Sequence, residues 1–168
     1  MRLIHLSDLH IGKRVNEFSM LEDQEYILKE ILGIIDDEQP DGVIIAGDVY
    51  DKSVPSEEAV KLLDSFLTSL AKRKLQVYII SGNHDSAAKL AFASSLIDLS
   101  EIHKSPVYDS AHIAMMGDGL VRPYKLEDGK GQLANIYMLP FVKPAMVRAV
   151  FPDEADDIKD YTDACRVA

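Results

Sequence analysis

Short apolar runs alternate with longer amphipathic stretches along the first hundred residues. The apolar runs are residues 2–7, 43–46 and 77–80. Their length and content of β-branched side chains are typical of strands, and the second run has the continuous apolar character of a strand buried on both faces. The amphipathic stretches repeat apolar side chains at helical spacing and are residues 20–38, 56–74 and 87–99. This alternation predicts an α/β fold with a parallel sheet and helices on both of its faces.

Polar residues mark where the first two predicted helices begin and end. The segment 39–42, which contains proline and glycine, ends the first helix. Ser56 is suited to cap the second helix, because its hydroxyl can accept a bond from a free backbone N–H. Glu57 and Glu58 follow it in the first turn, where negative charge favours the helix dipole. Residues 8–19, before the first helix, are expected to form a polar loop.

The pattern changes after about residue 105. Three short apolar segments follow, separated by glycine-containing turns, and they are residues 112–116, 120–126 and 133–139. Such segments predict hairpins, which we expect to form a second sheet. A short helix is predicted to start near Ala145, and residues 153–168 are expected to be helical and acidic.

Three polar motifs follow the three predicted strands directly. They are Asp8-Leu9-His10, Gly47-Asp48-Val49-Tyr50-Asp51 and Gly82-Asn83-His84-Asp85. The carboxyl ends of parallel strands meet at one edge of a sheet, so we expect these motifs to form one site. Asp8 and His10 are two residues apart on a segment that we expect to be extended, which would point both side chains to the same side.

The side chains in these motifs predict a metal-dependent hydrolase. Oxygen ligands mixed with imidazole nitrogen suit manganese, iron or zinc, and the predicted ligands are Asp8, His10, Asp48 and Asn83. Two divalent cations roughly 3.5–4 Å apart can hold both the attacking and the leaving oxygen of a phosphate ester. His84 is the best candidate for a general acid, because histidine titrates near neutral pH. Asp85 is the other predicted catalytic residue, with an orienting role.

Composition and charge indicate where the protein is located and which partners it can bind. The chain has 168 residues, of which 47% are hydrophobic, and one cysteine, Cys165, so it cannot form an intramolecular disulfide. The sequence contains no stretch resembling a signal peptide and no run long enough to cross a membrane, and we expect a cytoplasmic protein. The net charge of −10 argues against nucleic acid as a partner. Bound cations would offset part of this charge locally.

The three motifs resemble those of the calcineurin-like metallophosphoesterase superfamily. The stretch from Asp8 to Gln24 and the segment Leu139-Pro140-Phe141-Val142-Lys143-Pro144 are similar to the SbcD family of bacterial nuclease subunits. The resemblance implies a metallophosphoesterase-type β-sandwich flanked by helices. It also implies two Mn²⁺ ions, with Mg²⁺, Fe²⁺ or Zn²⁺ as alternatives, held by the residues named above. The implied activity is exonuclease cleavage of DNA ends and endonuclease cleavage of hairpins, in DNA repair, recombination and replication.

The resemblance also implies partners: an SbcC-type ATPase subunit, DNA and a second copy of the chain in a homodimer. Under this hypothesis Lys13 and Arg14, just past the first motif, contact DNA phosphates, although simple solvation explains them equally well. Asp51 is expected to contact the metal ligands and not the metal itself.

One departure from the family pattern limits the hypothesis. The family completes its metal site with later histidines, including a Gly-His-x-His pair that is absent from this sequence. We therefore expect residues 1–168 to be the N-terminal portion of a nuclease domain, incomplete at the C-terminus, without the capping region and with weak or no activity. Two alternatives stay open: a small-molecule phosphodiesterase of the same superfamily, and a catalytically incomplete fragment that serves only in interactions.

Overall fold

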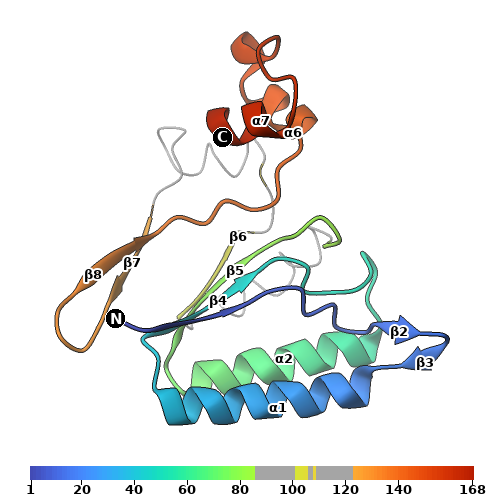
Figure 1. Ribbon diagram of the computed structural model, residues 1–168, viewed down its shortest axis with the longest axis vertical. Helices are drawn as coiled ribbons and strands as arrows, with labels where there is room; N and C mark the ends of the chain where they lie inside the picture. Colours follow the sequence, from blue (N-terminus) through green and yellow to red (C-terminus); the bar gives the residue numbers. More distant parts are fainter. Residues whose placement is uncertain (86–100, 106–107, 109–122) are drawn as a thin grey trace.

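The computed structural model describes residues 1–85, 101–105, 108 and 123–168 (Figure 1). The helix predicted at 87–99 and the strand predicted at 112–116 lie outside these residues. Across the described part of the chain, no helix is long and apolar enough to cross a membrane.

A four-stranded parallel sheet forms the centre of the fold. Its strands are β1 (Leu3–Leu6), β4 (Gly42–Ala46), β5 (Gln76–Ile80) and β6 (Ile102–Ser105), hydrogen-bonded in the order β1-β4-β5-β6. The three predicted strands and their parallel arrangement are confirmed. The fourth strand, β6, was not expected from the sequence, because His103 and Lys104 interrupt its apolar pattern. In the structure the His103 ring stacks on Tyr78 of β5, with the ring centroids 5.2 Å apart.

Two long helices, α1 (Leu21–Glu38) and α2 (Glu57–Lys72), lie side by side on one face of the sheet (Figure 1). The prediction of helices on both faces is wrong for the described residues. From β1 to β4 to β5 each step moves the same way across the sheet, so right-handed crossovers bring both helices to the same side. The strand residues that face the helices are Val43, Ile45, Val77 and Ile79, and they form the main hydrophobic core with both helices.

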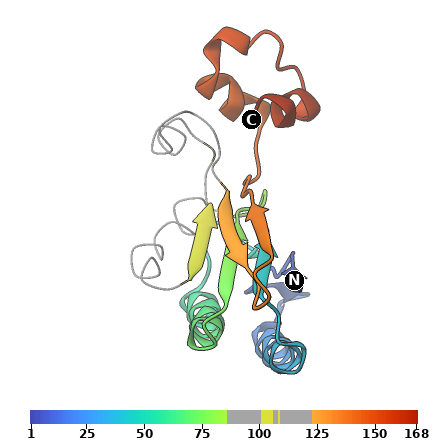
Figure 2. The same ribbon diagram turned by 90° about the vertical axis from the view of Figure 1, so that its left-hand side faces the viewer.

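A hairpin covers the opposite face of the sheet (Figure 2). Its antiparallel strands are β7 (Tyr124–Glu127) and β8 (Leu133–Ile136). Leu126 of β7 is buried against Tyr78, and Ile44 and Ile80 pack against the same cluster. Alternate residues of β4 and β5 therefore face the helices and the hairpin, as the continuous apolar runs predicted. This confirms the predicted second sheet. Strand β8 ends at Ile136, before the predicted end at residue 139, and residues 120–122 of the other predicted strand lie outside the described residues.

Helix α2 begins at the cap that the sequence predicts, and an ion pair joins the C-terminal ends of the two long helices. Ser56 caps α2 by accepting a bond from the backbone N–H of Ala59 at 3.3 Å. Arg73, just after α2, donates two hydrogen bonds to Asp36 of α1 at 2.7 and 2.6 Å. The guanidinium of Arg73 lowers the pKa of Asp36. The last turns of α1 and α2 are thus linked at the surface.

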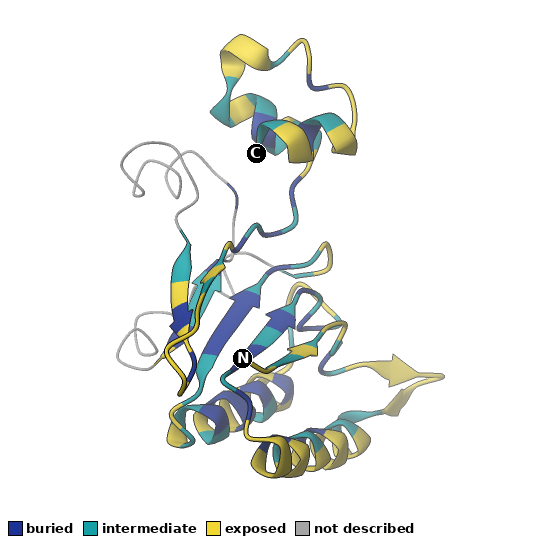
Figure 3. Cartoon of the chain, turned by 60° about the vertical axis from the view of Figure 1, so that its left-hand side comes forward, coloured by how far each residue is buried: buried dark blue, intermediate teal, exposed yellow. Residues whose placement is uncertain are grey.

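The apolar stripe of α1 is wider than the surface it buries. Leu28 and Ile35 are buried, as predicted, but Ile27 and Ile34 remain 51% and 54% exposed, and the neighbouring Tyr26 is 64% exposed. Periodicity identifies which side of a helix is apolar, but it does not show how much of that side its neighbours cover. Figure 3 shows this outer surface as mainly exposed.

The segment between β1 and α1 is not a simple loop. It contains a small hairpin, β2 (Arg14–Val15) and β3 (Phe18–Ser19), whose residues are exposed (Figure 3). Residues 8–19 contain no apolar alternation long enough to predict strands. The hairpin returns the chain so that α1 begins next to the first motif, and the backbone N–H of Met20 bonds to the Lys13 carbonyl at 3.0 Å.

The C-terminal segment forms a small helical unit on the side of the strands' carboxyl ends (Figure 1). It consists of α6 (Pro144–Val150), a 3₁₀ turn η1 (Pro152–Glu154) and α7 (Tyr161–Val167). The helix predicted near Ala145 is confirmed, whereas residues 153–168 are not one continuous helix. The side chain of Asp160 accepts a bond from the Asp163 N–H at 2.9 Å and thereby starts α7 as a new helix.

Candidate metal centre

The first two motifs are joined by backbone hydrogen bonds beyond the ends of β1 and β4. The N–H of Asp8 donates to the Gly47 carbonyl at 3.2 Å, and the N–H of His10 donates to the Asp48 carbonyl at 2.9 Å. A bridge between Ile11 and Tyr50 continues this pairing. The relative position of the two motifs is therefore fixed by the main chain.

The backbone around these side chains is not extended, contrary to the prediction for Asp8 and His10. Their φ angles are 55° and 42°, and that of Asp48 is 49°, all in the left-handed region. Non-glycine residues adopt this conformation at a cost of about 1–3 kcal/mol each, and they keep it only where the surroundings impose it. Asp8 and His10 do lie together, but the pairing with the second motif brings them there.

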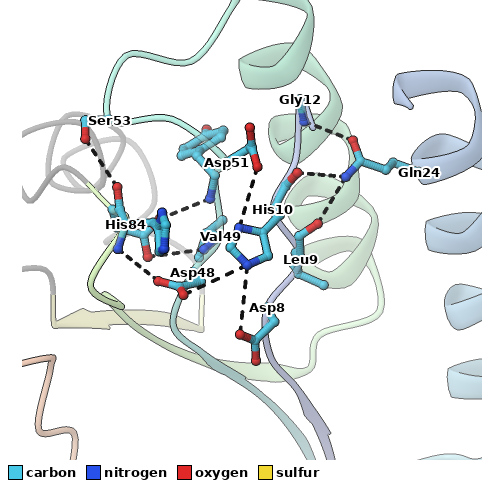
Figure 4. A network of polar contacts seen from close by, with 12 residues as sticks. Asp8, Leu9, His10, Gly12, Gln24, Asp48, Val49, Asp51, Ser53 and His84 are labelled. Atoms are coloured by element: carbon cyan, nitrogen blue, oxygen red, sulfur yellow. Dashed lines mark hydrogen bonds and ion pairs between the residues drawn. The ribbon is translucent and has the colours of Figure 1, made fainter. Parts of the chain in front are cut away.

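Three of the predicted ligands converge on one point (Figure 4). Candidate ligand atoms of Asp8, His10 and Asp48 all lie within 4.8 Å of one another. The Nε2 atom of His10 is 4.0 Å from Asp8 Oδ1 and 4.0 Å from Asp48 Oδ2. These separations exceed hydrogen-bond length. The side chains thus face one another without bonding, as groups arranged around a shared cation do.

The other ring nitrogen of His10 also fits a metal ligand. Nδ1 is buried and has no hydrogen-bond partner, and the nearest carboxylate oxygen, Oδ1 of Asp51, is 3.9 Å away. Histidines that bind metal through one nitrogen usually turn the other toward a carboxylate or carbonyl. Asp51 therefore lies next to the His10 ring, on its Nδ1 side.

Two glycines let the third motif approach Asp48. Gly47 has a φ of 84°, and a Cβ added there would lie 2.9 Å from the Gly82 Cα. A Cβ on Gly82 would lie 2.0 Å from Asp48 Oδ1. The same oxygen accepts a hydrogen bond from the N–H of His84 at 3.0 Å. The Asp48 carboxylate, which is 14% exposed, therefore occupies a cradle that only glycine leaves open.

Asp85 bonds to the main chain of two motifs. Its Oδ2 accepts from the N–H groups of Gly82 at 2.8 Å and Val49 at 3.1 Å, and its Oδ1 accepts from the N–H of Tyr50 at 3.0 Å. This carboxylate joins the second and third motif loops.

His84 lies at the exposed edge of this cluster. Its ring meets the His10 ring edge to face, with centroids 5.4 Å apart and an interplanar angle of 81°, and its carbonyl accepts a bond from the Ser53 hydroxyl at 3.3 Å.

Tyr50, by contrast, lies in the core. Burial, together with the charges of Asp64 and Asp85, raises the pKa of Tyr50 to about 12, so its phenol stays neutral near pH 7.

A cleft of about 450 Å³ opens beside the cluster, and Asp8, Asp48 and Asn83 contribute to its wall. Asn83 is exposed there. The same cleft is also lined by Phe141 and Tyr161, whose ring centroids are 6.1 Å apart. Phe141 lies within the family-like segment 139–144, but nothing in the sequence pairs it with Tyr161, which follows 20 positions later.

The two predicted phosphate-binding cations lie outside this cleft. Lys13 and Arg14 are exposed at the start of the β2–β3 hairpin, and the guanidinium of Arg14 donates to the Glu17 carbonyl. Arg14 lines a neighbouring hollow of about 440 Å³ together with Lys52. Lys52 was also missed from the sequence, because a single lysine after a motif is an ordinary surface residue.

Comparison with known proteins agrees with this geometry. The family model of the calcineurin-like phosphoesterases matches residues 1–160. The chain is 32% identical over 155 residues to the SbcD subunit of the SbcCD nuclease of Staphylococcus epidermidis (strain ATCC 12228 / FDA PCI 1200). That match covers 92% of this chain and 38% of the relative, so the chain spans well under half of the relative's length. The chain belongs to the calcineurin-like phosphoesterase family.

Proposed function

We propose that this chain carries part of the metal-dependent phosphodiesterase centre of a DNA nuclease subunit. The observation that carries the proposal is the convergence of Asp8, His10 and Asp48 around one point, with the buried Nδ1 of His10 turned toward Asp51. Carboxylates with an imidazole suit a divalent transition metal. The 32% identity to a relative named as a nuclease subunit supports DNA as the substrate.

The proposed ligands are Asp8, His10, Asp48 and Asn83, and the proposed cofactor is a pair of Mn²⁺ ions, with Mg²⁺, Fe²⁺ or Zn²⁺ as alternatives. Such ions, when bound, polarise the phosphate and lower the pKa of a coordinated water. Four ligands are few for two ions, so we expect slow turnover by this chain.

The chain's own residues complete the proposed chemistry. His84 stands at the open edge of the cluster, where its imidazole can give a proton to the leaving oxygen of the cleaved ester. The hydrogen bond from the His84 backbone N–H to Asp48 fixes the position of the main chain from which the imidazole projects. Asp51 orients His10, and Asp85 holds the loop that carries both Asn83 and His84. Neither aspartate needs to touch the substrate in this scheme.

Two features beside the cluster favour a nucleic acid over a small ester. Phe141 and Tyr161 form an aromatic wall in the same cleft as the proposed ligands, and nucleobases stack on such rings. Lys13, Arg14 and Lys52 lie near the adjacent hollow or line it and are proposed to contact backbone phosphates. The proposed activities are exonuclease cleavage at DNA ends and endonuclease cleavage at hairpins.

The proposed partners follow from the similarity to a component of SbcCD: an SbcC-type ATPase and a second copy of this chain. Tyr26, Ile27 and Ile34 expose apolar surface on α1, and such patches often mark contacts between proteins. A DNA substrate agrees with the cytoplasmic location that we expect from the sequence, and with roles in DNA repair, recombination and replication.

A small-molecule phosphodiesterase is the second candidate. The net charge of −10 favours it, because a long polyanion is repelled by an acidic protein where a small ester is repelled less.

The test is Mn²⁺-dependent cleavage by the wild-type chain and by Asp48→Ala. Linear DNA, hairpin DNA and a bis-aryl phosphate serve as substrates. We expect slow cleavage of both DNAs that disappears in the variant. Cleavage of the bis-aryl phosphate alone would support the second candidate. Equal cleavage by the two proteins would place the activity elsewhere than in this cluster.

A further inference from the structure

One side chain of helix α1 reaches into the loop that carries His10. Gln24 donates from Nε2 to the Leu9 carbonyl at 3.1 Å and to the His10 carbonyl at 2.8 Å. Its Oε1 accepts from the N–H of Gly12 at 2.9 Å. Figure 4 shows this amide meeting the loop on the side away from Asp48.

These contacts hold a part of the chain that needs support. His10 and Gly12 both have positive φ angles, 42° and 90°, and His10 has a side chain that disfavours this conformation. On one side the loop is held by the second motif, through the His10 N–H bond to the Asp48 carbonyl. On the other side Gln24 holds it, so the loop is fixed between the second motif and α1.

A primary amide suits this position because it donates and accepts at once. The loop offers two carbonyls and one N–H to the half-buried side chain. A glutamate could accept from Gly12 but could not donate to Leu9 or His10, and a methionine of similar length cannot donate and is only a weak acceptor. This position therefore requires a side chain that both donates and accepts hydrogen bonds, and not only one with the volume of glutamine.

We propose that Gln24 is a positioning residue that fixes the backbone of His10, and through it the direction of the imidazole, for binding a divalent cation. This inference rests on the proposed function, because it assumes that His10 is a ligand. It adds α1 to the elements that build the centre. Residues that orient metal ligands typically change metal affinity by about 10–100-fold when they are replaced.

The test compares Gln24→Met with Gln39→Met, titrating Mn²⁺ into each purified chain and following free Mn²⁺ by electron paramagnetic resonance. Gln39 is a matched control because it also donates from Nε2 to a main-chain carbonyl, that of Asp36 at 2.7 Å, at the opposite end of α1. We expect Gln24→Met to weaken Mn²⁺ binding about tenfold or more and Gln39→Met to leave it unchanged. Equal affinity in Gln24→Met and the wild-type chain would overturn the inference.

A second readout needs no metal. Amide hydrogen exchange in the metal-free chain reports directly on the N–H of Gly12, which we expect to be protected in the wild-type chain and exposed in Gln24→Met. In Gln24→Glu the Gly12 amide should stay protected, because the acceptor is kept. Unchanged exchange in Gln24→Met would also overturn the inference.

Asp48→Ala separates this inference from the proposed function. If Asp48→Ala binds Mn²⁺ as well as the wild-type chain does, the proposed metal centre fails, and the inference fails with it. If Asp48→Ala loses binding while Gln24→Met keeps it, only the role of Gln24 is refuted.

Discussion

Replacing Asp85 with alanine should destabilise the metal-free protein strongly, although Asp85 is not a proposed ligand. Its carboxylate accepts three backbone N–H bonds, from Val49, Tyr50 and Gly82, at 2.8–3.1 Å. Val49 is 0% exposed and Tyr50 is 6% exposed, so water can replace the lost acceptor poorly at those two residues.

The magnitude follows from these contacts. A buried donor left without a partner costs roughly 1–3 kcal/mol. Two such donors, on Val49 and Tyr50, give a loss of about 2–6 kcal/mol in the free energy of unfolding. Gly82 is only half-buried and is left out of this sum. A domain is stabilised by only about 5–15 kcal/mol in total, so the loss should be obvious.

The assay is urea unfolding followed by circular dichroism in the presence of a chelator, with linear extrapolation to water. Asp51→Ala is the matched control, because that carboxylate faces His10 Nδ1 across 3.9 Å, and we expect it to change stability by less than about 1 kcal/mol. Asp85→Asn keeps the volume but turns a donor toward at least one N–H, so it should also destabilise. A loss below about 1 kcal/mol in Asp85→Ala would mean that these three bonds do not hold the loops together.

Three further predictions follow from particular contacts. Gly82→Ala should abolish Mn²⁺ binding measured by calorimetry, because the new Cβ would lie 2.0 Å from Asp48 Oδ1; unchanged affinity would contradict the cradle. Tyr161→Leu should lose the preference for intact over abasic DNA in equilibrium binding, whereas Tyr161→Phe should keep it, since stacking needs only the ring; a preference retained in Tyr161→Leu would refute the aromatic wall. The backbone N–H of Gln132 is the largest cause that lowers the pKa of Asp128 below its ordinary 3.8. The stability that Asp128 contributes is therefore fully present above that pH and is lost as the pH falls below it toward the lowered folded value. The free energy of unfolding should differ less between pH 7 and pH 3 in Asp128→Asn than in the wild-type chain. An equal difference in the two proteins would count against this contact.

Much of the fold was predictable because its signals are local. The run from Val43 to Ala46 is apolar at every position, as a strand covered on both faces requires. The start of α2 was set by the Ser56 hydroxyl. The convergence of Asp8 and Asp48 followed from parallel strands that end at one edge.

What the sequence did not reveal depends on contacts between distant segments. The left-handed backbone of Asp8 and His10 is imposed by hydrogen bonds to Gly47 and Asp48, and a two-residue spacing suggested an extended segment instead. The face of the sheet that the helices cover depends on strand order, which no single helix encodes.

Two further features were missed because their partners are remote in sequence. Strand β6 includes His103, a polar residue that becomes acceptable in a strand once it stacks on Tyr78. The Phe141–Tyr161 wall joins two rings that are 20 positions apart. Neither pairing leaves a periodic signal.

Whether the three motif loops bind divalent metal can be seen in a crystal of this chain grown with Mn²⁺, with diffraction recorded at the manganese absorption edge. We expect an anomalous peak enclosed by Asp8, His10, Asp48 and Asn83. If saturating Mn²⁺ gives no peak between these four side chains, or gives peaks only at surface carboxylates elsewhere, the proposed metal centre is wrong.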